Sequence, residues 1–222
     1  MDHICLITFR PKKSWCKFLN TFTKYKIVII VDDNDFDLSL FKYENIKFIK
    51  IKDEICKQNG YENTNFFIKP ISGWDKALYY FGLENSNYNF VWFLEDDVFF
   101  YNENTLLTID KEYKKDDLLS NNFNINQNGV KNTWHWNKIN INYTPPYYHG
   151  MMCIVRFSKK MMFCINDYAK KNNTLFFLEA MFPTIAIKNK LKYNNPTQFN
   201  DVHYRHKFTK KKYKKKKSIP SY

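Results

Sequence analysis

An unbroken β-branched run is the feature that most constrains how this chain can fold. Residues 27–31 (IVIIV) contain only Ile and Val, and Asp32 and Asp33 follow them directly. Such a run is typical of a strand buried on both faces, as in parallel sheets that helices cover on both sides. We therefore expect a central strand that carries two carboxylates at its carboxyl end.

Further apolar segments surround this strand. Strands are predicted at residues 3–9, 46–51 and 90–94, and helices at residues 14–22 and 72–83. Ser72 and Asp75 form a capping-box pattern at the start of the second helix. This alternation predicts an α/β fold with a mostly parallel central sheet flanked by helices.

The second half of the chain is less regular. Residues 101–150 are rich in Asn, Asp and Lys, which suits site loops and a small secondary subsheet. A strand is predicted at residues 151–156 and helices at residues 158–169 and 173–188. We expect one domain, residues 1–206, with a first half (1–101) and a second half (102–206).

The net charge of +13 is concentrated near the C-terminus, where residues 207–217 contain eight lysines. Such a block predicts a flexible, solvated tail at residues 207–222. Its functional alternatives are contact with an anionic membrane or nonspecific binding of RNA or DNA.

The cysteines and the apolar segments indicate a cytoplasmic protein. The five cysteines show no CxxC pairing, which indicates reduced thiols rather than a disulfide framework. No segment reaches the roughly 18 apolar residues that a membrane span needs, and the N-terminus does not resemble a signal peptide.

A second acidic group, Glu95, Asp96 and Asp97, lies between two aromatic, apolar runs (NFVWFLEDDVFFY). Crowded carboxylates beside a core are costly unless a positive charge neutralises them. Ligands of open parallel sheets bind beyond the carboxyl ends of the strands, where both acidic groups are expected. The alternatives are a site for Mg²⁺ or Mn²⁺, which prefer such hard oxygen ligands, or an Asx-rich turn.

The segments IVIIVDDNDFD and SGWDKALYYFGLENSNYNFVWFLEDDVFF together resemble the nucleotide-sugar-binding half of GT-A fold glycosyltransferases, over residues 3–101. The acidic group matches the Asp-x-Asp-type motif of that superfamily, with Glu at its first position. The resemblance implies a Rossmann-like sheet, a nucleotide-diphosphate sugar as donor, and a glycan or other hydroxyl acceptor.

The resemblance also implies roles for the first half of the donor site. Thr8 and Arg10 would border the nucleotide base, and Asp32 or Asp33 would accept a hydrogen bond from it. Lys76 would approach the diphosphate or the sugar; the alternative is a solvated helical lysine.

For the acidic motif, the resemblance implies Mn²⁺ or Mg²⁺ as the cofactor and Asp97 as the main metal ligand. Glu95 would bind ribose hydroxyls or the metal through water, and Asp96 would face the donor sugar. His203 is the preferred late histidine for the same metal; His203 and His206 are otherwise surface residues.

Glu179 is the candidate general base of an inverting reaction. It is a single acid in an apolar segment (LFFLEAMFPT) at a helix start, and burial there would raise its pKa toward neutrality. The alternative is a first-turn acid that the helix dipole favours. The aromatic residues of TWHW and TPPYYHG either line an acceptor site or pack in the core.

Three other functions compete with the transferase. A nucleic-acid-binding protein leaves the strand-end acids unexplained, and no such motif is present, so we expect no specific nucleic acid. A nucleotidyltransferase would carry a Gly-rich loop after its first strand, where this chain has TFRPKKSW. A non-catalytic sugar-nucleotide-binding domain is the third.

Overall fold

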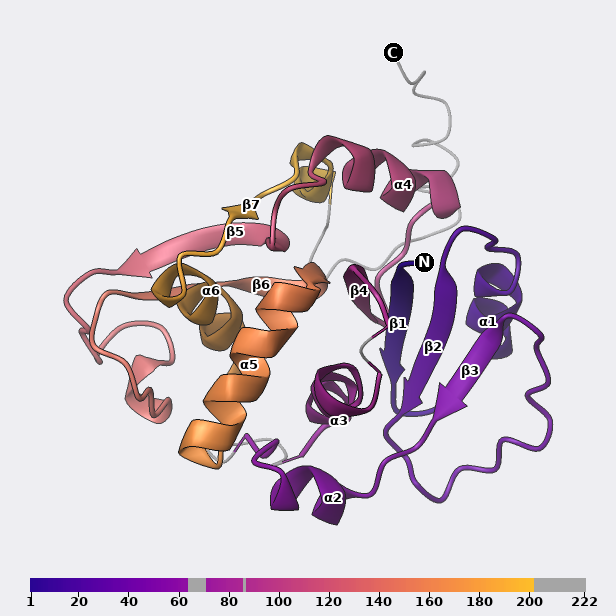
Figure 1. Ribbon diagram of the computed structural model, residues 1–222, viewed down its shortest axis with the longest axis horizontal. Helices are drawn as coiled ribbons and strands as arrows, with labels where there is room; N and C mark the ends of the chain where they lie inside the picture. The colour runs from indigo at the N-terminus through magenta and orange to yellow at the C-terminus, as the bar shows by residue number, and fades with distance from the viewer. Residues whose placement is uncertain (64–70, 86, 202–222) are drawn as a thin grey trace.

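The computed structural model describes residues 1–63, 71–85 and 87–201, which form an α/β fold (Figure 1). The strands are β1 His3–Thr8, β2 Lys26–Val31, β3 Ile46–Ile49, β4 Phe90–Glu95, β5 Leu118–Asn126, β6 Tyr147–Ser158 and β7 Tyr193–Asn194. The α-helices are α1 Lys13–Leu19, α2 Asp53–Gln58, α3 Gly73–Tyr79, α4 Glu103–Glu112, α5 Lys159–Asn172 and α6 Leu178–Lys188. Shorter turns are the π-helical η1 Tyr80–Glu84 and the 3₁₀ helices η2 Trp136–Lys138 and η3 Thr197–Asp201.

These strands form one sheet in the order β3-β2-β1-β4-β6-β5-β7. The neighbours β3, β2, β1 and β4 pair in parallel, and β6 is antiparallel to β4. Alternate side chains of β1 enter two cores: Cys5 and Ile7 pack with α3, α5 and α6, whereas Ile4 and Leu6 pack with α1 and α4. The predicted α/β class, with a mostly parallel sheet flanked by helices, is confirmed.

The second half extends the same sheet instead of forming a separate subsheet within the described residues. The C-terminal part of β6 pairs with β4, up to Leu94 against Ile154. Its N-terminal part continues past the end of β4 and pairs with β5 alone, as in Asn124 against His149. The length of β6 therefore lets one strand serve both the parallel sheet and the ribbon beyond it.

The predicted capping box is present: the Asp75 carboxylate accepts hydrogen bonds of 2.8 Å from the backbone N–H and the hydroxyl of Ser72. The helix predicted at residues 173–188 begins later, at Leu178. Asn173 instead ends α5 in the left-handed region, with φ of 53°, so the chain turns before α6. This shift places Glu179 in the first turn of α6.

A buried ion pair fixes α4 to the sheet. Arg156 on β6 is fully buried, and its Nη1 lies 2.7 Å from Oδ1 of Asp110 on α4. The indole of Trp92 and the hydroxyl of Tyr25 donate to the same carboxylate. None of the described helices is both long and apolar enough to cross a bilayer, and no cysteine forms a disulfide.

Candidate functional site

The carboxyl ends of β1, β2 and β4 meet at a cleft of about 220 Å³. They meet because β1 lies between β2 and β4 and pairs with both in parallel. The residues that line this cleft are Ile7, Thr8, Phe9, Asp32, Gly73, Trp74, Glu95, Asp96 and Asp97. Residues from two acidic groups about sixty positions apart in the sequence thus share one cleft, at the edge where ligands of parallel sheets bind.

The three carboxylates of the acidic motif have different surroundings. Glu95 is half-buried and accepts a hydrogen bond of 2.8 Å from Nε1 of Trp74. Burial raises its pKa, which the Trp74 hydrogen bond lowers in part and the charges of Asp97 and Asp96 raise further. Asp96 accepts a hydrogen bond of 2.7 Å from the Thr8 hydroxyl and lies 3.6 Å from Nζ of Lys12.

Asp97 is the exposed member of the motif, and its carboxylate forms no hydrogen bond or ion pair with the described residues. The described part of the chain also contains no group of three or more His, Cys, Asp or Glu side chains arranged to hold a metal. A divalent ion here would therefore need ligand oxygens such as those of a diphosphate, the usual arrangement for Mg²⁺. The exposed Asp97 carboxylate beside two others is compatible with an ion that the protein shares with a diphosphate. His203, the predicted further ligand, lies outside the described residues.

Of the two acids after β2, Asp32 lines the cleft, whereas Asp33 does not. Nε of Arg10 lies 2.6 Å from Oδ2 of Asp33, and this hydrogen bond holds the Asp33 pKa below its usual value. The Arg10 guanidinium also lies 5.3 Å from the ring centre of Phe9 and 5.7 Å from that of Phe36. Arg10 and Asp33 thus form a pair beside the cleft.

Lys76 lies beneath the cleft instead of facing it. Its side chain is fully buried, so the alternative of a solvated helical lysine is wrong. Nζ lies 2.8 Å from both the backbone oxygen and Oδ1 of Asp32, and 2.8 Å from Oδ1 of Asp53. Burial lowers the Lys76 pKa, but the bonds to Asp32 and Asp53 outweigh it and raise the pKa overall. With these three oxygens around it, the ammonium reaches a ligand only indirectly, through Asp32.

Replacing Lys76 with methionine is expected to lower the free energy of unfolding by about 3 kcal/mol, because two carboxylates lose their buried cation. The measurement is urea unfolding followed by circular dichroism. Lys57→Met is the control: Lys57 is an exposed lysine 3.7 Å from Glu62, and a surface pair contributes at most about 1 kcal/mol. Equal losses in the two variants would contradict the structural role of Lys76.

Glu179 approaches the cleft from the second half of the chain. It is half-buried and forms no hydrogen bond or ion pair with the described residues. Burial, with a further contribution from the charge of Glu95, raises its pKa to about 7. The helix α6 also reaches the cleft wall, because the rings of Phe182 and Trp74 lie 5.7 Å apart. Glu179 and Glu95 are therefore near enough to interact electrostatically.

Aromatic rings lie next to the start of α6. The ring of Trp134 stacks on that of His149 at 4.1 Å and lies 5.7 Å from Phe177, two residues before Glu179. Trp136 is buried in the core. Trp134 itself is only partly buried and has φ of 46°, which is uncommon for a bulky residue. The TWHW segment thus supplies both a core residue and a half-exposed ring.

Sequence reasoning missed four of the residues that line the cleft, Ile7, Phe9, Gly73 and Trp74, of which two are aromatic. Phe9 is 61% exposed, although it ends an apolar run, and the helical spacing of Trp74 indicates only a core position. The signal for Phe9 was its place directly after the last residue of β1, where the run of buried strand residues ends. The sequence gives no sign that Trp74 lines the cleft, because its indole hydrogen-bonds to Glu95, a residue that comes close only in the folded protein.

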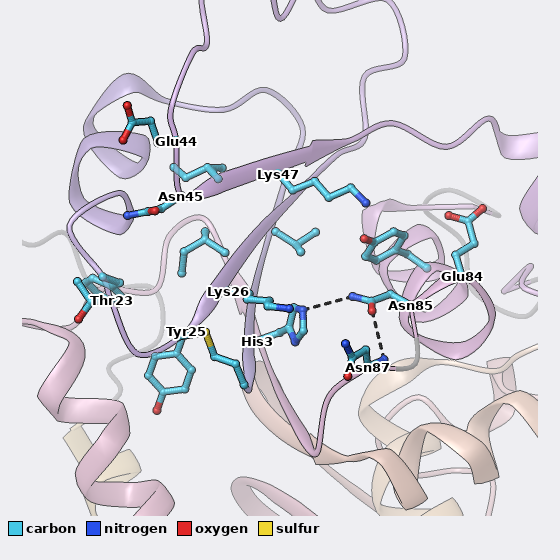
Figure 2. A pocket seen from close by; sticks show the side chains of 16 residues that line it. His3, Thr23, Tyr25, Lys26, Glu44, Asn45, Lys47, Glu84, Asn85 and Asn87 are labelled. Carbon is cyan, nitrogen blue, oxygen red and sulfur yellow. Dashed lines mark hydrogen bonds between the residues drawn. The ribbon is translucent and has the colours of Figure 1, made fainter.

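A larger cavity of about 820 Å³ lies at the opposite, amino-terminal edge of β1, β2 and β3 (Figure 2). Two lysines, Lys26 and Lys47, and two glutamates, Glu44 and Glu84, are among its lining residues. None of the strand-end acids reaches it. We place the functional site at the smaller cleft because the acidic groups converge there.

No protein-family profile matches the chain, and no curated protein matches it. Three solved structures are similar over 92–93% of this chain: 4-diphosphocytidyl-2C-methyl-D-erythritol synthase from Anaerococcus prevotii DSM 20548, an active-site mutant of LgtC, and mouse xyloside xylosyltransferase 1 in its apo form. In that order, their sequence identities to this chain are 9%, 14% and 8%, and their TM-scores are 0.49, 0.47 and 0.45. The match covers 90%, 80% and 91% of their own chains. Similarity at this level carries no argument about the function of this chain.

Proposed function

We propose that this protein is a metal-dependent glycosyltransferase that moves a sugar from a nucleotide-diphosphate sugar to a hydroxyl acceptor with inversion. The observation that carries the proposal is the meeting of Asp32 and residues 95–97 in one cleft. Glu179 lies near enough to this cleft for the charge of Glu95 to raise its pKa. A structural turn would not need a carboxylate such as that of Asp97, which forms no hydrogen bond or ion pair with the described residues, beside two others in a hollow.

The donor would occupy the cleft, with its base near Phe9 and Asp32. The exposed Phe9 ring offers an apolar face for stacking, and Asp32 offers an acceptor oxygen that Lys76 holds in place. Asp97, with Glu95, would hold Mn²⁺ or Mg²⁺, which would supply Lewis-acid stabilisation of the negative charge on the departing diphosphate. Asp96, which Thr8 and Lys12 orient, would face the donor sugar.

The acceptor would enter from the side of α6. The Glu179 carboxylate takes the proton of the acceptor hydroxyl while that oxygen bonds to the anomeric carbon and the bond from this carbon to the diphosphate breaks. A base needs a pKa near the working pH, and that of Glu179 is about 7. The half-exposed Trp134 ring would hold an acceptor sugar by stacking, as aromatic faces do.

A thermal-shift screen of nucleoside diphosphates, with and without Mn²⁺, tests this proposal. A ligand that binds only the folded state raises the melting temperature by mass action, so we expect one diphosphate to raise it only with metal. Asp97→Asn should abolish that shift, whereas Asp167→Asn, an exposed acid on α5, should keep it. No metal-dependent shift with any diphosphate would overturn the proposal; a shift without sugar transfer would favour the non-catalytic binding domain.

A further inference from the structure

The segment that follows the acidic motif leaves two aromatic side chains on the surface. Val98 and Phe100 are buried at 8% and 7% exposure, whereas Phe99 and Tyr101 between and after them are 60% and 45% exposed. Large exposed aromatic rings in a continuous group are uncommon on soluble surfaces and mark interaction sites. The alternation shows that this segment buries one side and presents the other.

These two rings continue onto the helix α1. Phe18 of α1 stacks on Phe99 with ring centres 6.5 Å apart, and Phe99 lies 6.0 Å from Tyr101. Trp15 packs edge-on against Phe18 at 5.6 Å, and both are only partly buried. We call Trp15, Phe18, Phe99 and Tyr101 the aromatic patch.

Exposed cations border the aromatic patch on α1. Lys13 and Lys17 are four residues apart, so they lie on one stripe of the helix, and Lys12 precedes it; all three are exposed. Aromatic rings beside lysines are the composition that lies at the boundary between lipid headgroups and acyl chains.

The nearest acids offset only part of this positive charge: Lys12 lies 3.6 Å from Asp96 and Asp97 is exposed, whereas Lys13 and Lys17 form no ion pair with the described residues. The carboxylate of Glu103 accepts hydrogen bonds from the backbone N–H groups of Thr23 and Lys24, at 3.0 and 2.6 Å. Asp96 is engaged by Thr8 and Lys12. The surface formed by the aromatic patch and these lysines is thus aromatic and basic, which complements an anionic bilayer and opposes a cationic partner.

We propose that the aromatic patch, with Lys12, Lys13 and Lys17, docks the protein on an anionic membrane surface. A bilayer explains both halves of the surface: the rings enter the interface while the lysines bind headgroups. The Lys-rich segment 207–217 supplies a second electrostatic attraction, and stable membrane attachment usually needs two such signals.

Docking by this surface would hold the cleft at the bilayer. The indole of Trp15 donates a hydrogen bond of 2.8 Å to the backbone oxygen of Asp96, and Phe99 follows Asp97 by two residues. The patch therefore adjoins the segment that supplies the acidic motif of the cleft. The docking itself does not depend on the proposed reaction, so a protein without transferase activity would still bind vesicles.

Co-sedimentation of the full chain with vesicles tests the proposal. We expect binding to phosphatidylcholine vesicles that contain about a third phosphatidylserine and little binding without it. Lys13→Gln with Lys17→Gln should weaken the partition coefficient about 30-fold, since each lysine near an anionic surface contributes about 1 kcal/mol. Lys170→Gln with Lys171→Gln, on α5, is the control that removes the same charge from elsewhere.

A second pair of variants separates the patch from the lysine-rich segment. At about 0.5 M salt electrostatic attraction is screened, so residual binding should depend on Phe99 and Tyr101 and should be lost in Phe99→Ser with Tyr101→Ser. Phe163→Ser, which removes a 68% exposed ring from α5, should change nothing. The proposal is overturned if the wild type does not bind, if the patch variants behave as their controls, or if light scattering shows that the patch instead joins two copies of the chain.

Discussion

Replacing Glu179 with glutamine is expected to lower the transfer rate constant by about 10²–10⁴-fold, the usual contribution of a general base. Glutamine keeps the size of the side chain but has no basic oxygen with a pKa near 7, so the acceptor hydroxyl loses its proton acceptor. The substitution alters none of the residues that line the cleft proposed for the donor, so we expect the donor affinity to stay within about twofold. Initial-rate kinetics and calorimetric titration of the donor measure the two quantities.

The pH profile gives an independent check of the same role. The pKa of Glu179 is raised to about 7, and a base acts only when deprotonated, so kcat/KM should rise with pH up to about 7 and then level off. The variant should lose this rise. Glu54→Gln, an exposed acid on α2, is the matched control and should keep both rate and profile. A transfer rate retained in Glu179→Gln with intact donor binding would remove Glu179 from the mechanism.

The central strands were predictable because their side chains are buried on both faces. Residues 27–31 became β2 and the run before Glu95 became β4, each within one residue of the expected ends. The alternation of strands and helices predicted that neighbouring strands are parallel, so that their carboxyl ends share one edge, and Asp32 and Glu95 meet there. A continuous apolar run is a strong indication of a central strand, because a strand in a sheet covered on both faces buries every side chain of such a run.

The elements and residues that sequence reasoning missed depend on contacts between distant segments. Helix α2 buries only Cys56, and helix α4 buries only Leu106 and Ile109. The apolar periodicity of both helices is therefore weak. The burial of Lys76 depends on Asp53 in α2, a helix that was not predicted. In a lysine-rich chain nothing local distinguishes Lys76 from exposed lysines such as Lys57; only the folded arrangement of Asp32 and Asp53 around Lys76 does.

Replacing Asp97 with asparagine is expected to lower metal-dependent transfer by about a hundredfold or more. Lewis-acid stabilisation of a leaving diphosphate contributes several kcal/mol, and a neutral amide binds Mn²⁺ more weakly than a carboxylate. The fold should be unaffected, because Asp97 is exposed and forms no hydrogen bond or ion pair with the described residues. Activity measured against Mn²⁺ concentration, with melting temperature as the check on folding, tests this expectation.

Two comparisons decide whether Asp97 acts through a metal. If it does, a higher Mn²⁺ concentration should partly restore the rate of Asp97→Asn, and chelation of the wild type should reproduce the loss; Asp167→Asn should resemble the wild type throughout. If chelation leaves the wild-type rate unchanged while Asp97→Asn is slow, the carboxylate contacts the substrate directly. In that case the repulsion among Glu95, Asp96 and Asp97 is offset by the hydrogen bond from Trp74 to Glu95 and by the contacts of Thr8 and Lys12 with Asp96.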